Sequence, residues 1–172
     1  MALRDILKDA VYDAKAPISD ADFIRNYNAV VRDLAKRYEV ATKITETAFS
    51  NTSGTEWYAL TSGCLGVKRV VDEDGETTRH YSIRDGVEIH FTYDGNYTVF
   101  EQVPHAKITA LTATPTLNGQ FDEAVAKYVA SKCAKDGADK LYGEYLAEAE
   151  MANNTIRRNR NKNAQVGVTP YI

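Results

Sequence analysis

Residues 87–103 have the sequence VEIHFTYDGNYTVFEQV, and this stretch decides the type of fold. Apolar and polar side chains alternate on both sides of Asp94-Gly95-Asn96. A period of two indicates strands with one buried face, and Gly and Asn tolerate the positive φ that a tight return requires. We therefore predict two antiparallel strands that form a hairpin around residues 94–96.

Two further returns divide the chain before this hairpin. They are DEDG at residues 72–75 and DG at residues 85–86, each between β-rich segments. Consecutive short returns predict an antiparallel meander of about four strands. We place this β-region at residues 42–114.

Helical periodicity flanks the β-region on both sides. From Leu3 to Ala14 apolar residues recur at intervals of three and four, as in an amphipathic helix. Ser19 is a suitable N-cap for a second helix, because its hydroxyl can accept from the amide of Asp22. About four residues join these two helices, and helices with so short a connection usually fold back on each other as an antiparallel hairpin. The predicted helices are 3–15, 19–39, 120–135 and 138–152.

The order of these elements predicts an α+β fold, namely a four-helix bundle with an inserted antiparallel β-meander and an extended C-terminal arm. Residues 1–152 form the predicted domain and residues 153–172 the arm. Most of the arm is Asn and basic residues, which bury too little apolar surface to order the chain alone. Its end, VGVTPYI, is apolar again, which favours an arm that folds against a partner.

Charge is divided unevenly along the 172 residues. The formal net charge of -3 comes from 21 Lys and Arg against 24 Asp and Glu. Residues 153–172 carry four bases and no acid, so that the arm is +4 and residues 1–152 are -7. An acidic body argues against a protein that binds nucleic acid over its whole surface. A nucleic-acid-binding module that uses only the basic arm stays open.

Membrane and disulfide-rich classes do not fit the sequence. No stretch approaches the roughly 18 apolar residues of a membrane span, and the first residues lack the apolar core of a secretory signal. The two cysteines, Cys64 and Cys133, are far apart and form no CxxC motif. We expect no membrane association.

Catalytic residues do not form a recognisable set. His80, His90 and His105 have no neighbouring carboxylate in a pattern that would orient a general base. Cys133 lies in an apolar helical pattern, where a free cysteine behaves as a small hydrophobe. Residues 72–75 share the opening of a calcium loop, but its distal ligands are missing and a hairpin tip fits better. We predict that the chain is no enzyme and holds no cofactor or metal.

Four segments together resemble the head-to-tail adaptor (connector) proteins of tailed bacteriophages. They cover nearly the whole chain in the same order of elements, at residues 3–39, 57–75, 81–104 and 121–159. The resemblance implies a structural virion protein at the head-to-tail interface, synthesised in the cytoplasm of the bacterial host. Such adaptors form a ring oligomer, usually a dodecamer, below the portal, and they act in viral genome packaging and tail assembly.

The resemblance also implies partners. These are the portal protein, a tail or second connector protein, and further copies of the chain in the ring, while double-stranded DNA passes through the channel without sequence-specific binding. An acidic body suits this role, because like charge discourages contact with phosphates. A tail-tube or tail-terminator protein remains an alternative. The residues implied to form the portal-binding arm are Asn153, Ile156, Arg157, Arg158, Arg160, Lys162, Val168, Tyr171 and Ile172.

Overall fold

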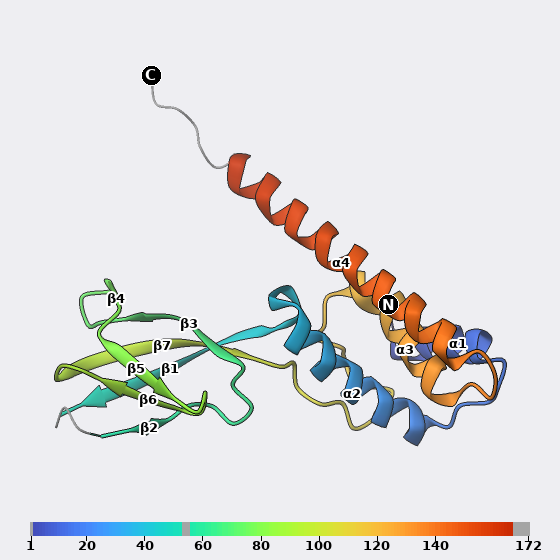
Figure 1. Ribbon diagram of the computed structural model, residues 1–172, viewed down its shortest axis with the longest axis horizontal. Helices are drawn as coiled ribbons and strands as arrows, with labels where there is room; N and C mark the ends of the chain where they lie inside the picture. Colours follow the sequence, from blue (N-terminus) through green and yellow to red (C-terminus); the bar gives the residue numbers. More distant parts are fainter. Residues whose placement is uncertain (1, 53–55, 167–172) are drawn as a thin grey trace. The chain divides into compact units, whose positions relative to one another are not determined.

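The computed structural model describes residues 2–52 and 56–166, with side chains as far as Asn161. The chain divides into two compact units. The helical unit takes the chain up to Ala41 and again from His105, and the β unit is the segment Thr42–Pro104 between them (Figure 1). Because the first and last strands of the β unit pair with each other, its two ends lie side by side, as an inserted unit requires.

The helical unit is built around α3. Its helices are α1 (Leu3–Ala14), α2 (Asp20–Arg37), α3 (Asp122–Cys133) and α4 (Ala138–Val166), with 3-10 turns η1 (Glu39–Ala41) and η2 (Gly119–Phe121). α3 packs against each of the other three helices. The predicted cap of α2 is confirmed, since the Ser19 hydroxyl accepts from the amide of Asp22 at 3.1 Å.

The core of the helical unit is continuous through all four helices. Phe23, Val125 and Tyr145 are fully buried in it. A side-chain clamp holds the segment that returns from the β unit against α2: the Asn28 amide donates to the carbonyl of Ile108 and accepts from its N–H, both at 2.9 Å. These two hydrogen bonds satisfy the N–H and the carbonyl of Ile108, which lies in no strand or helix that would pair them.

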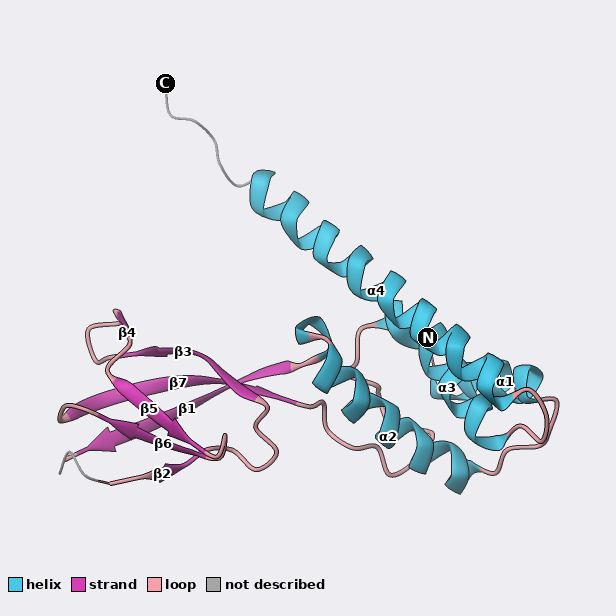
Figure 2. Ribbon diagram, viewed as in Figure 1, coloured by secondary structure: helices cyan, strands magenta, loops and turns pink. Residues whose placement is uncertain are grey.

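The β unit contains two antiparallel sheets (Figure 2). The first has the order β1 (Lys43–Asn51), β7 (Gly95–Val103), β3 (Gly66–Val71), β4 (Thr77–Thr78). The second has the order β2 (Tyr58–Ala59), β6 (Glu88–Phe91), β5 (Tyr81–Arg84).

The two sheets share one small core. Ile89 and Phe91 of the second sheet are fully buried together with Val99 of the first. The rings of Phe91 and Tyr97 stack nearly parallel, with centroids 4.2 Å apart. The buried Asn51 amide donates to the carbonyl of Phe91 at 3.3 Å, which ties the end of β1 to the end of β6.

The predicted hairpin around residues 94–96 is wrong. β6 pairs with β2 and β5, whereas β7 pairs with β1 and β3, so the turn carries the chain from one sheet to the other. Along both strands, inward-facing side chains alternate with outward-facing ones. Two strands in different sheets that face each other across a core show this alternation, and so do two strands that pair within one sheet. The returns at 72–75 and 85–86 are confirmed by β3 with β4 and β5 with β6.

The predicted fold class is also wrong. The chain is mixed α+β with four helices and two antiparallel sheets in the described residues, but it is not a four-helix bundle with an inserted meander. β7 lies between β1 and β3, which excludes a meander. The main partner of α1 is α3, not α2, so the predicted hairpin of the first two helices is incorrect.

The extended arm is the third correction. Residues 153–166 continue α4 as helix. The physical reason is that Asn153 and Ile156 prolong the buried stripe of Tyr145, Ala149 and Ala152 at helical spacing. The apolar end of the predicted arm, residues 167–172, lies outside the described residues.

Candidate functional site

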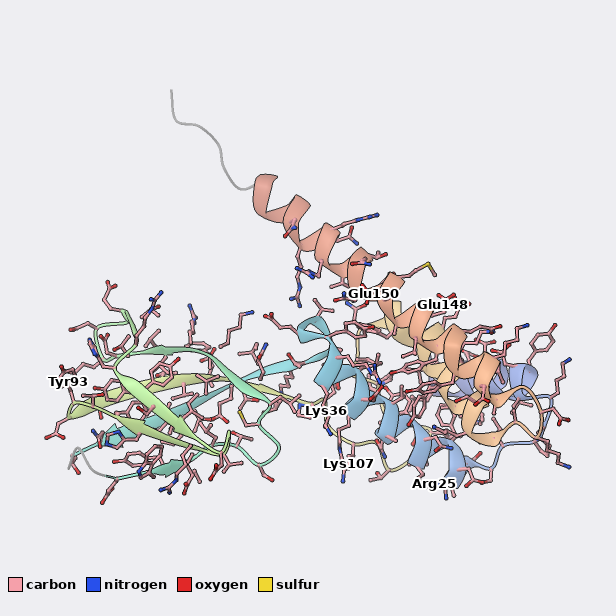
Figure 3. All side chains as sticks on the ribbon, in the orientation of Figure 1. Arg25, Lys36, Tyr93, Lys107, Glu148 and Glu150 are labelled. Atoms are coloured by element: carbon pink, nitrogen blue, oxygen red, sulfur yellow. The ribbon has the colours of Figure 1, made fainter. Side chains whose placement is uncertain are left out.

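The first candidate surface is the exposed end of α4 at residues 157–161, which contains Arg157, Arg158 and Arg160 and which we call the basic end. The last turns of α4 extend past α3 (Figure 1), and Ile156 is the last buried residue described. Every residue from Arg157 to Asn161 is exposed. On the same helix, Glu148 and Glu150 precede this end, so acidic and basic turns follow one another along α4 (Figure 3).

The structure separates the residues predicted for the portal-binding arm into four groups. Asn153 and Ile156 are 8% and 6% exposed, and Ile156 belongs to the helical core. The side chains of Arg157, Arg158 and Arg160 are exposed. The backbone of Lys162 is helical. Val168, Tyr171 and Ile172 lie outside the described residues.

A groove lies between the end of α2 with η1 and the basic end of α4. Its volume is about 350 Å³, and we call it the basic groove. The α4 residues in it are spaced by four, three and one, so they share one face of the helix. Arg158 does not line the groove, since it lies about 100° around the helix from Arg157. The lining residues are Arg37, Tyr38, Glu39, Val40, Asn153, Arg157, Arg160 and Asn161.

The three arginines of the basic groove differ in their surroundings. Arg37 pairs with Asp33 on the preceding turn of α2, with Nε 2.8 Å from Oδ2, and this hydrogen bond raises the pKa of Arg37. For Arg157 and Arg160 the structure shows no ion pair within the described part of the chain. The positive charge that the groove can offer to a ligand therefore comes chiefly from Arg157 and Arg160.

A tyrosine cluster in contact with Asp33 and Arg37 holds the Arg37 side chain in place. The hydroxyl of Tyr145 donates to the same Asp33 oxygen that accepts from Arg37. The Tyr145 ring packs against Tyr128 and Tyr142, with centroids 5.1 and 5.5 Å away. Burial and the hydrogen bond to Asp33 raise the pKa of Tyr145, so it remains a neutral donor at physiological pH. The chain of contacts from Tyr145 through Asp33 positions one guanidinium at the groove.

The β unit carries an opposite charge. Its segment, residues 42–104, contains ten acids and five bases, for a net charge of -5. Part of this charge gathers at the turn between β3 and β4, residues 72–76, which we call the acidic tip. Its exposed carboxylates are those of Glu73, Asp74 and Glu76.

The acidic tip has an ordered backbone. Asp72 Oδ1 accepts from the amides of Asp74 and Glu76 at 3.2 and 2.9 Å. The amide of Gly75 donates to the Asp72 carbonyl at 3.1 Å, and the φ of +81° at Gly75 is one that favours glycine. The tip is therefore a fixed turn that presents carboxylates outward. Sequence reasoning weighed these residues as a calcium loop and preferred a hairpin tip, but it did not treat the density of acids in DEDGE as a charged surface, which was the available signal.

The three histidines are not brought together into one site. His90 packs against Trp57, with ring centroids 5.3 Å apart, on the face of β6 opposite the buried Ile89. His80 contacts Tyr93, which lies exposed at the outer end of the β unit (Figure 3). His105 Nδ1 lies 3.0 Å from the hydroxyl of Thr116.

The cysteines show no sign of activation. Burial raises the pKa of both the Cys64 and the Cys133 thiol, so each is mainly protonated at neutral pH. In the ranges that the structure describes, no three His, Cys, Asp or Glu side chains are grouped to hold a metal ion. None of the described helices has the length and apolar character that crossing a bilayer requires.

Comparison with known proteins adds no family to these observations. Neither a protein-family model nor a curated protein sequence matches the chain. The basic groove and the acidic tip are therefore the features from which a function has to be argued.

Proposed function

We propose that this chain is a structural virion protein, a head-to-tail adaptor of a tailed bacteriophage. In this role it forms a ring below the portal, joins the capsid to the tail and lets DNA pass. The observation that supports the proposal best is the basic end of α4, where a well-anchored helix presents three exposed arginines beyond the core of its own unit. Such a helix can reach a second protein without any change in the helical unit.

The chemistry of this end suits contact with protein. Arginine is enriched at protein interfaces because its planar guanidinium forms paired hydrogen bonds with carboxylates. Burial of Tyr145, Ala149 and Ile156 fixes α4 in the helical unit, so the arginines are held on a rigid element. Pre-organised side chains lose less entropy on binding than those of a loose tail. The portal protein is the partner that this role assigns to the basic end.

The β unit suits a different contact in the same role. It is inserted between α2 and α3 and forms its own compact core, so it can meet a tail protein while the helical unit meets the portal. Its net charge of -5 disfavours adhesion to passing DNA, because phosphates are attracted to bases and repelled by acids.

Immunogold electron microscopy of the phage particle that carries this chain tests the proposal directly. Antibodies against the β unit should place gold at the junction of head and tail. Gold along the tail shaft would favour the tail-tube alternative instead. Absence of the chain from purified particles, measured by mass spectrometry, would contradict a virion protein altogether.

A pull-down with the portal protein encoded beside this chain tests the role of the basic end. Deletion from residue 153 would remove Asn153 and Ile156 from the core, so the useful truncation ends at Asn161. We expect that truncation, and separately Arg158→Glu, to weaken portal capture while far-UV circular dichroism stays helical. Glu150→Gln, an exposed change one to two turns earlier on α4, is the matched control and should leave capture unchanged. Full capture by both altered proteins would show that the basic end takes no part in the portal contact.

A nucleic-acid-binding module is the second candidate, because the same three exposed arginines could neutralise phosphates. Fluorescence anisotropy with a labelled duplex, followed over a salt series, separates the two. A steep loss of affinity with salt, removed by changing the arginines to glutamine, supports nucleic-acid binding. No binding at low salt rejects it.

A further inference from the structure

We infer that the basic groove of one copy of this chain binds the acidic tip of a neighbouring copy, so that copies associate head to tail. The inference rests on the proposed function only in assigning this contact to the wall of the ring, where Arg157 and Arg160 contact the neighbouring copy and Arg158, outside the groove, is left to the portal. The contact itself concerns two surfaces of the described chain, and it can be tested without a phage particle.

The groove has unused positive charge in a fixed position. Arg157 and Arg160 lie on one face of α4; Arg157 directly follows the buried Ile156, and Arg160 lies about one turn after it. Arg37 enters from α2 and is held by Asp33, and the amides of Asn153 and Asn161 add further polar groups to the lining. These guanidinium and amide donors outnumber Glu39, the one carboxylate of the lining, so a groove of about 350 Å³ fits further carboxylates better than apolar side chains.

The tip has unused negative charge in a fixed position as well. Among the described residues, the Glu73 carboxylate accepts one long hydrogen bond, 3.4 Å from the side-chain amide of Asn96. For Asp74 and Glu76 the described residues include no Lys or Arg at ion-pair distance. The turn is short and its backbone is hydrogen-bonded, so that little conformational entropy remains to be lost when it enters a groove.

A second copy is the occupant that the charges favour. The groove and the tip are complementary in sign and lie on separately folded units of the same chain. Every copy therefore supplies both a groove and a tip. Assembly itself brings the groove of one copy and the tip of another to a high local concentration. DNA is a weaker candidate for the groove, because the chain is acidic overall and only two of the groove arginines lack a carboxylate partner.

Such a contact has a defined symmetry. Two different surfaces meet, so the interface is heterologous, and repeated contacts of this kind form a ring if the rotation closes. Ion pairs at an exposed groove respond strongly to salt, because the Debye length falls from about 10 Å at 0.1 M to about 3 Å at 1 M. Self-association should therefore weaken as salt is added.

Sedimentation of two charge-reversed proteins provides the experiment. One is Arg157→Glu with Arg160→Glu, which damages the groove, and the other is Glu73→Lys with Asp74→Lys, which damages the tip. Each alone should associate at least about tenfold more weakly than the unchanged chain at low salt. Mixed together they should associate again, because the intact tip of the first fits the intact groove of the second and the reversed groove of the first attracts the reversed tip of the second.

Controls separate this contact from general charge effects. Arg158→Glu changes the neighbouring residue outside the groove, and Glu46→Lys changes an exposed acid on β1 away from the tip. Both should leave self-association within about twofold of the unchanged chain. Circular dichroism of all variants should be that of the folded chain.

Three results would overturn the inference. They are an unchanged chain that stays monomeric at low salt up to millimolar concentration, a mixture of the two reversed proteins that associates no better than either alone, and equal losses in the control proteins. Because none of these measurements involves the portal, a failure here leaves gold labelling and portal capture as independent tests of the proposed function.

Discussion

At the scale of single residues, the contact between Tyr145 and Asp33 links the core to the basic groove. Tyr145→Phe keeps the buried ring but removes the hydroxyl that donates to Asp33. A hydrogen bond to a charged group contributes about 1.5–3 kcal/mol, and we expect that loss in the free energy of unfolding measured with urea. Tyr142→Phe is the control, since its hydroxyl meets Arg37 only at 3.5 Å. An equal loss in both proteins would contradict a special role for Tyr145.

Tyr27 gives the helical unit a defined response to alkaline pH. Its side chain is 3% exposed, and burial, with a smaller contribution from Asp122, raises the pKa of Tyr27 to about 12. In the unfolded chain the pKa is about 10, so the neutral form stabilises the fold below pH 10 and this contribution is lost between pH 10 and 12.

The loss should amount to about 2–3 kcal/mol in the free energy of unfolding. The measurement compares urea unfolding of the unchanged chain and Tyr27→Phe from pH 9 to 12. Across that interval, the free energy of unfolding of the unchanged chain should fall relative to that of Tyr27→Phe. A constant difference would show that Tyr27 ionises alike in the folded and unfolded chains.

At the scale of elements, α4 is longer than its sequence pattern predicts. Ile156 lies 6% exposed in the core, so Ile156→Ala should lower the free energy of unfolding by about 2–4 kcal/mol. Thr155→Ala, an exposed neighbour on the same turn, should change it by less than about 0.5 kcal/mol. Urea unfolding followed at 222 nm measures both. A negligible effect of Ile156→Ala would mean that α4 is not anchored beyond Ala152.

The same helix shows what the sequence could and could not predict. Periodicity and the Ser19 cap located the helices, because these signals are local. The run of Asn and basic residues at 153–163 concealed its one apolar residue, Ile156, whose partners come from distant parts of the chain. The partners of β6 and β7 were hidden for the same reason, since alternation places a side chain on a face but does not choose a neighbouring strand.

The candidate site was predictable in part. The arginines of the basic end were visible as a charge run in the sequence. Arg37 was not, because it reaches the groove only through the packing of α2 against the rest of the helical unit. The acidic tip could have been noticed from its composition, but its significance depends on a groove of opposite charge that only the structure shows.

At the scale of the whole molecule, the division into two units predicts two unfolding events. Trp57 is the only tryptophan of the chain and belongs to the β unit, so its fluorescence reports on that unit, while ellipticity at 222 nm reports mainly on the helices. Separate cores should give transitions at different urea concentrations, contrary to a single two-state transition.

Matched core substitutions make this prediction specific. Ile156→Ala should shift the transition at 222 nm and leave that of Trp57 in place, whereas Val99→Ala, fully buried in the β unit, should do the reverse. Each shift follows from the cavity that the smaller side chain leaves in its own core. If either substitution moved both transitions equally, the two units would unfold as one.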